Sequence, residues 1–177
     1  MAGGDFQADR PIVLVGLMGA GKTTVGRRLA ARLGLPFVDT DAEVARAAGL
    51  AVAQMFDRLG EAAFRERERD AVARLAAGPP RVIAAGGGAF VDEVGRGLLL
   101  ASCTTVWLDA GVETRARRVG RDGGGRTLLR GRDPRAALAA LAEQRRPFYA
   151  AAHFRVDAEG PVEAVADRVM AALDRRR

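Results

Sequence analysis

The sequence predicts an α/β fold in which helices cover both faces of a parallel sheet. Short apolar runs alternate with segments whose apolar residues recur three or four positions apart, as strands and helices do in such folds. A glycine-rich stretch at residues 16–23 follows the apolar run 11–15 and precedes a helical pattern. The length, 177 residues, suits one domain that buries a core, and we expect a single domain over residues 1–177.

Residues 16–23 read GLMGAGKT and match the pattern G-x-x-x-x-G-K-T in the required strand–loop–helix context. Backbone N–H groups of such a loop surround phosphate oxygens, and the next helix adds the positive end of its dipole. Lys22 is the only lysine among the 28 lysine and arginine residues. At this position in the loop the guanidinium of an arginine would be too wide. We expect Lys22 at the β- and γ-phosphates of a nucleoside triphosphate and Thr23 on Mg²⁺. The predicted nucleotide ligands are Gly19, Ala20, Gly21, Lys22, Thr23 and Thr24.

The composition restricts the class of protein. The net charge of +6 suggests nucleic-acid binding, but the arginines are spread among acidic residues and aromatic residues are few, so we expect none. A basic enzyme with two anionic substrates explains the charge equally well. Cys103 is the only cysteine, which excludes an internal disulfide, and we expect it in the core. The N-terminus is polar, so we expect no signal peptide, and no apolar run is long enough to span a membrane. We therefore expect a cytoplasmic location.

The remaining elements follow in order. Strands are expected at residues 35–38, 81–85, 104–108 and 153–156. Helices are expected at 42–59 with a split near Gly49, at 61–77 after a break at Gly60, and at 92–101, 112–119, 133–148 and 161–173. Gly34 should end the first helix, and Asp92 and Asp133 should begin theirs. The glycine-rich stretch 121–132 is a candidate lid, with Arg126 placed to reach the transferring phosphoryl group.

Two acidic residues end the second strand. Asp39 and Asp41 would point the same way if the strand continued through both, toward the edge where ligands bind. Asp41 could instead be a helix N-cap, but this explains only one of the pair. Carboxylates of this kind suit hydroxyl groups, because they accept hydrogen bonds and can take a proton.

Two arginines suit an anion. Arg65 lies between Glu61 and Glu68 at helical spacing, and Glu68 falls on the buried stripe. Arg145 follows the apolar stripe of its helix and should face inward, whereas Arg146 is turned about a third of the way round the helix. The three glycines at 86–88 should leave bare backbone N–H groups for a ligand. Together these groups predict a small hydroxylated carboxylic acid as acceptor, with residues 39–68 as the main acceptor-binding region.

The order of these motifs resembles that of a known family. The stretches GLMGAGKT, DTD, GEAAFRERE, GGG and RRPFY occur in the order seen in shikimate kinases, and the resemblance runs from residue 12 to the last helix. It implies a three-layer α/β/α fold with a five-stranded parallel sheet of order 2-3-1-4-5 and a mobile lid. It also implies ATP-dependent phosphorylation of the shikimate 3-hydroxyl, with Mg²⁺, by a monomer.

The resemblance implies a role for each matching residue. Asp41 would bind the shikimate hydroxyls and act as base, and Asp39 would hold the Mg²⁺ shell through water. Arg65 and Arg145 would bind the shikimate carboxylate, and the pocket would be lined by Gly86, Gly87 and Gly88. Arg126 would contact phosphate. Arg118 would stack on the adenine, with Pro161 on its other side. The family's lid usually reads Arg-Pro-Leu-Leu, whereas this chain has Thr127 after Arg126. Loss of proline adds backbone freedom, so we expect a poorly ordered lid without ligand.

Other classes fit less well. The chain contains no asparagine and no second lysine, so the guanine-reading motif of GTPases cannot occur. The protein-kinase catalytic loop is excluded for the same lack of asparagine. A kinase of gluconate or another small hydroxy acid on the same scaffold is the alternative, although the DTD and GGG stretches favour shikimate.

Overall fold

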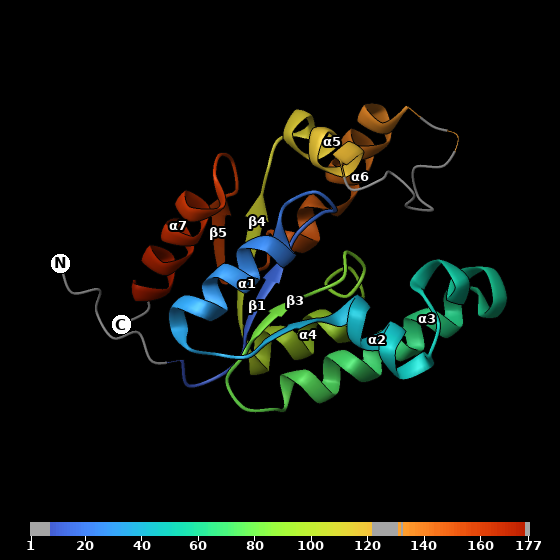
Figure 1. Cartoon of the computed structure of the whole chain (residues 1–177), viewed down its shortest axis with the longest axis horizontal. Helices are drawn as coiled ribbons and strands as arrows, with labels where there is room; N and C mark the ends of the chain where they lie inside the picture. Colours follow the sequence, from blue (N-terminus) through green and yellow to red (C-terminus); the bar gives the residue numbers. More distant parts are fainter. Residues whose placement is uncertain (1–7, 122–130, 132, 176–177) are drawn as a thin grey trace.

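A computed structural model describes residues 8–121, 131 and 133–175 of the chain (Figure 1). Arg126, Thr127 and most of the expected lid lie outside the described residues, so the predictions made for them stay predictions.

The described residues form a five-stranded sheet whose strands all run parallel. The strand order is β2-β3-β1-β4-β5, which confirms the expected topology. In this register Ile12 of β1 lies between Val82 of β3 and Thr104 of β4. The strands are β1 (Ile12–Val15), β2 (Phe37–Asp39), β3 (Val82–Ala84), β4 (Thr104–Asp109) and β5 (Phe154–Asp157).

The helices occupy the segments expected from periodicity and caps. Gly34 and Gly49 end the first two helices in the left-handed conformation. Gly60, with φ 81° and ψ 169°, interrupts the third helix, which confirms the predicted break there. Asp92 and Asp133 cap α4 and α6 through the backbone N–H groups of Gly95 and Ala136. The helices are α1 (Lys22–Leu33), α2 (Thr40–Ala48), α3 (Val52–Ala76), α4 (Glu93–Ser102), α5 (Val112–Arg121), α6 (Pro134–Tyr149) and α7 (Val162–Asp174).

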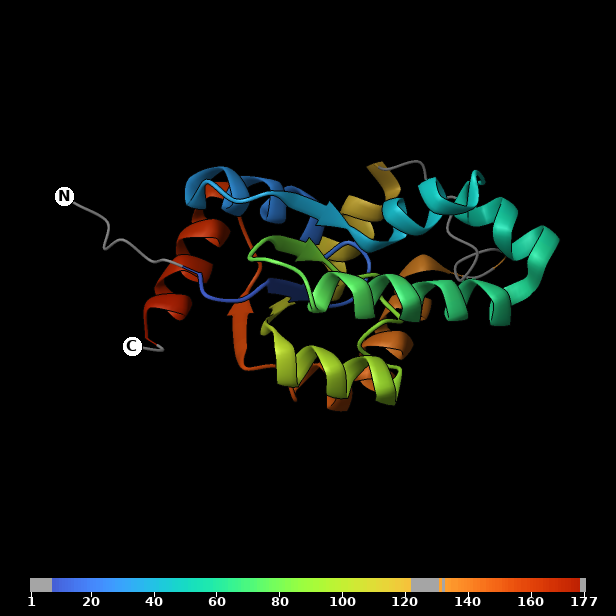
Figure 2. The ribbon, with the colours of Figure 1, turned by 90° about the horizontal axis from the view of Figure 1, so that it is seen from below.

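Helices cover both faces of the sheet. Side chains alternate along β1, so that Val13 and Val15 enter one core and Ile12 and Leu14 the other. The first core packs against α3, α4 and α6, and the second against α1 and α7, as the two views show (Figures 1 and 2). Cys103 is fully buried in the first core, as expected.

Because all strands are parallel, their carboxyl ends lie at one edge, where ligands bind in open α/β sheets. Polar loops and helix starts follow β1, β2 and β3 at this edge. Helices α2 and α3 extend the molecule beyond it (Figure 1). Within the described part of the chain, no helix is long and apolar enough to cross a membrane.

Candidate active site

A cleft of about 1000 Å³ lies at the carboxyl edge of the sheet. It is lined by the phosphate loop (residues 16–23), the start of α1, the two aspartates after β2, the inner side of α3 and the glycine turn (residues 86–88). Arg118 of α5 and Arg145 of α6 complete it. Of the expected site residues, thirteen line this one cleft: Gly19, Gly21, Lys22, Thr23, Thr24, Asp39, Asp41, Arg65, Gly86, Gly87, Gly88, Arg118 and Arg145.

The phosphate loop has the backbone that its glycines permit. Gly19 and Gly21 have φ values of 77° and 91°, in the region that side chains rarely adopt. The ammonium of Lys22 donates to the carbonyl oxygens of Gly16 and Leu17, at 2.7 and 3.0 Å, and so lies across the loop. Helix α1 begins at Lys22, so its N-terminal N–H groups face the cleft where an anion would sit. Ala20, within the loop, is buried and does not line the cleft.

Thr23 and Asp39 bring two side-chain oxygen atoms together. The hydroxyl of Thr23 donates to Asp39 Oδ2 at 2.7 Å across the loop. Among the described residues no group of three or more His, Cys, Asp or Glu could hold a metal. A pair of hard oxygen donors beside a phosphate site nevertheless fits Mg²⁺, which usually takes only one or two protein ligands and completes its shell with water and phosphate.

The structure corrects one expectation about the two aspartates. The strand does not continue through them: β2 ends at Asp39 and α2 begins at Thr40. The cap is Asp39, whose Oδ1 accepts from the N–H groups of Asp41 and Ala42 at 3.0 and 3.3 Å, so the alternative of a cap at Asp41 is excluded. Both carboxylates still line the cleft, because the first turn of α2 directs Asp41 toward the glycine turn.

A second correction concerns the glycine turn. Its N–H groups are not all bare, since Gly86 N donates to the hydroxyl of Thr40 at 2.7 Å. Thr40 is fully buried between the two aspartates, and no sequence pattern pointed to a role for it. Glycine is required in this turn because a larger side chain would overlap its neighbours. A Cβ on Gly86 would overlap Asp41 Oδ1 and lie 2.6 Å from Glu68 Oε1, and one on Gly88 would overlap Arg65 Nη1. The turn is thus the point at which three charged side chains meet.

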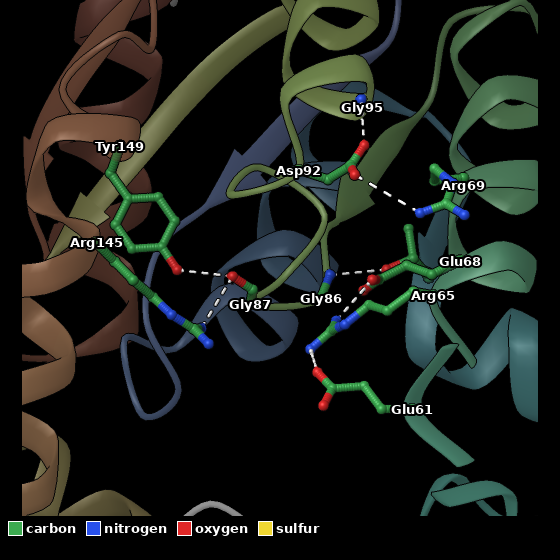
Figure 3. Close-up of polar contacts among 11 residues, drawn as sticks. Glu61, Arg65, Glu68, Arg69, Gly86, Gly87, Asp92, Gly95, Arg145 and Tyr149 are labelled. Atoms are coloured by element: carbon green, nitrogen blue, oxygen red, sulfur yellow. Dashed lines mark hydrogen bonds and ion pairs between the residues drawn. The ribbon is translucent and has the colours of Figure 1, made fainter. Parts of the chain in front are cut away.

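Arg65 is held as the sequence predicts. Its guanidinium donates to Glu68 at 2.7 Å and to Glu61 at 3.4 Å, both on α3 (Figure 3). The Glu68 side chain is 3% exposed, against 26% for Arg65. Burial raises the pKa of the Glu68 carboxyl, Arg65 opposes this, and the charges of Asp41 and Asp92 add to the rise. The buried carboxylate of Glu68 therefore holds the guanidinium of Arg65 in place in the cleft.

Arg145 reaches the same turn from the opposite side. It donates to the carbonyl oxygen of Gly87 at 3.1 Å, and the Tyr149 hydroxyl donates to the same oxygen at 2.9 Å (Figure 3). Arg145 is half-buried and Arg146 exposed, which confirms the predicted helical phase. Tyr149 belongs to the RRPFY stretch, and its role in the site was not predicted from the sequence. Its position four residues after Arg145 could have revealed that both share one helix face.

Arg118 links the phosphate loop to the turn before α7. It donates to the carbonyl oxygens of Gly19 and Ala20 in the phosphate loop, and to those of Ala158 and Gly160 before α7. Pro161 is the N-cap residue of α7 and does not itself line the cleft, whereas Gly160 and Val162 on either side of it do.

Comparisons with known proteins agree on one family. The family model described as "Shikimate kinase" matches residues 18–174. The chain belongs to the shikimate kinase family. It is 55% identical to a shikimate kinase of Paramagnetospirillum magneticum over 166 residues, which cover 93% of this chain and 84% of the relative.

Solved structures support the same assignment. A shikimate kinase from Acinetobacter baumannii in complex with shikimate matches with a TM-score of 0.91 and 35% identity, over 97% of each chain. A gluconokinase from Sinorhizobium meliloti matches with a TM-score of 0.63 and 22% identity, over 94% of this chain and 93% of that one. The second likeness shows a shared fold alone. The fold and family expected from the sequence are therefore confirmed, and the chain is an enzyme of this kinase family.

Proposed function

We propose that this enzyme transfers the γ-phosphoryl group of ATP to the 3-hydroxyl of shikimate, giving shikimate 3-phosphate and ADP. Family membership supports the reaction, and the match to a shikimate complex supports the acceptor. The single observation that carries the acceptor site is the meeting of Asp41, Arg65 and Arg145 at one glycine turn. These residues come from three helices, and the turn is in the same cleft as the phosphate loop.

On the nucleotide side, the N–H groups of the phosphate loop and the start of α1 hold the phosphates. Lys22 supplies a compact positive charge for the β- and γ-phosphates, and Thr24 is a further proposed nucleotide ligand. Thr23 and Asp39 would hold Mg²⁺, which when bound neutralises charge on the phosphate oxygens. Arg118 and Pro161 are proposed beside the adenine. Arg126 is proposed at the transferring phosphoryl group, on the expected lid.

On the acceptor side, two guanidinium groups fit the two oxygens of a carboxylate. Arg65 and Arg145 approach the glycine turn from opposite sides, so an acid placed over the turn could contact both (Figure 3). Asp41 then accepts hydrogen bonds from the ring hydroxyls and takes the proton of the attacking oxygen. The residues align the acceptor with the phosphate loop, and catalysis comes mainly from this positioning and from charge neutralisation.

The test is an assay of ADP release with shikimate, gluconate and RNA as separate additions. We expect stimulation by shikimate alone, and phosphorus NMR should identify the 3-phosphate. Stimulation by gluconate alone would support the alternative hydroxy-acid kinase. We further propose a cytoplasmic monomer without nucleic-acid or membrane partners, which cell fractionation and sedimentation would check.

A further inference from the structure

A second cavity, of about 480 Å³, lies apart from the cleft, between β4, α5 and α6. Its volume falls within the range of about 300–1000 Å³ typical of small-molecule sites. The side chains of Trp107, Val112, Ala139 and Ala142 provide apolar walls. Arg115 and Arg146 bring two guanidinium groups to the same cavity.

Arg115 has an unusual environment for an arginine. It is 6% exposed, and its Nε is buried without a hydrogen-bond partner among the described residues. Its guanidinium forms no ion pair there either, so a buried cation stands without a contacting anion. Burial lowers the pKa of Arg115, and the nearby charges of Asp109 and Glu159 only partly oppose this.

The carboxylates of the cavity are mostly engaged elsewhere. Asp109 accepts from Arg155 at 2.6 Å. Glu159 accepts from Gly111 N and from the Thr114 hydroxyl, each at 2.6 Å. Asp157 accepts from the N–H of Glu159, and Glu143 is exposed. None of these four carboxylates forms a hydrogen bond or ion pair with Arg115, although Asp109 and Asp157 end the neighbouring strands β4 and β5.

Arg146 adds a second cation. Its guanidinium lies 5.9 Å from the centre of the Trp107 ring and makes no hydrogen bond or ion pair with the described residues. The charge of Arg146 also lowers the pKa of Arg115, so the two guanidinium groups are close enough to repel. An oxyanion between them would relieve both the repulsion and the missing partner of Arg115.

We propose that this second cavity binds a small organic anion, whose carboxylate or phosphate lies between Arg115 and Arg146 and whose apolar part packs on Trp107. Its occupant would contact residues that support both the glycine turn and the phosphate loop. Tyr149 lines the second cavity while its hydroxyl bonds Gly87 in the cleft, and Leu17 of the phosphate loop lines it too. The backbone of Arg115 lies against Gly19, with Arg115 O 2.8 Å from the position of an added Cβ.

The test uses the indole N–H resonance of Trp107, the only tryptophan in the chain, as a reporter in NMR spectra. The whole protein is saturated with ADP, Mg²⁺ and shikimate to fill the cleft, and is then titrated with benzoate and, separately, with sulfate. We expect both probes to shift the resonance saturably, benzoate at the lower concentration. Arg115→Gln should weaken the binding of both probes by about tenfold or more, and Arg146→Gln should weaken it by a smaller factor. Arg117→Gln removes the same charge from the same helix and should leave both unchanged.

Shifts that stay linear, or that are equal in all the variants, would overturn the proposal. So would a crystal structure with water alone joining Arg115 to Asp109 and Glu159. If Arg115→Gln does not fold, the exposed Arg146→Gln still decides the outcome. Because Arg115 and Trp107 lie outside the cleft, a failure here is distinct from a failure to phosphorylate shikimate.

Discussion

Arg65 and Glu68 form an ion pair of 2.7 Å within one turn of α3, between a side chain that reaches the cleft and one that is buried. The pair lies directly against the glycine turn, since added Cβ atoms on Gly86 and Gly88 would collide with Glu68 and Arg65 respectively. A carboxylate out of contact with water therefore sets the position of the guanidinium that we assign to the acceptor.

Glu68→Gln should change the pH dependence of stability. The pKa of Glu68 is raised, chiefly by burial, so above the ordinary glutamate value of about 4.3 the folded protein binds more protons than the unfolded chain. The contribution of Glu68 to the free energy of unfolding therefore falls as pH rises through this window. The difference between wild type and variant, measured by urea denaturation at several pH values, should decrease from acidic to neutral pH. The exposed Glu66→Gln is the control, and a difference for Glu68→Gln that is constant with pH would contradict the prediction.

Thr23→Ala should weaken the use of Mg²⁺. The variant loses the hydroxyl that bonds Asp39 at 2.7 Å, and with it one proposed metal ligand. We expect kcat/KM to fall about 100-fold and the Mg²⁺ concentration for half-maximal rate to rise. Thr23→Ser keeps the hydroxyl and should stay within about threefold of wild type. Steady-state kinetics over a range of Mg²⁺ concentrations checks this, and equal behaviour of the two variants would remove Thr23 from the metal site.

Arg145→Ala and Arg146→Ala should differ sharply in shikimate binding. Arg145 donates to Gly87 of the glycine turn, where we propose that the acceptor binds, whereas Arg146 is exposed on the neighbouring part of α6. A hydrogen bond to a charged group contributes about 1.5–3 kcal/mol, so Arg145→Ala should weaken binding by about 10- to 100-fold. Arg146→Ala should change it by less than about twofold. Calorimetric titration with shikimate measures both, and similar losses would show that the acid group lies elsewhere.

Gly88→Ala should damage acceptor binding through Arg65. The new Cβ would overlap Arg65 Nη1, so the guanidinium must leave its place between Glu61 and Glu68. We expect the KM for shikimate to rise about tenfold or more while the KM for ATP changes little. Gly97→Ala is the matched control, because nothing lies within 4 Å of its added Cβ on the exposed side of α4. It should stabilise the protein by about 0.5–1 kcal/mol and leave kinetics unchanged. Equal KM values for Gly88→Ala and wild type would contradict the proposed crowding at the turn.

Much of the site was accessible from local sequence. The phosphate loop is a contiguous stretch, so its residues and their spacing identify it directly. Helical periodicity correctly predicted that Arg145 faces inward and that Glu61 and Glu68 brace Arg65, because residues three and four apart share a face. The wrong prediction for the aspartates was also local. A strand end and a helix cap both suit Asp39-Thr40-Asp41, and the capping bonds of Asp39 decide between them.

The alternation of strands and helices, the glycine breaks and the family could be predicted from residue order, since these depend on neighbours along the chain. Which distant groups meet depends on how the chain packs: Thr40 meets Gly86, Arg145 and Tyr149 meet Gly87, and Arg118 meets two loops. These contacts join residues 40 to 99 positions apart, and they form because parallel strands place their carboxyl ends at one edge. The second cavity around Arg115 arises in the same way, from helices packed across β4, and no local pattern in the sequence predicts it.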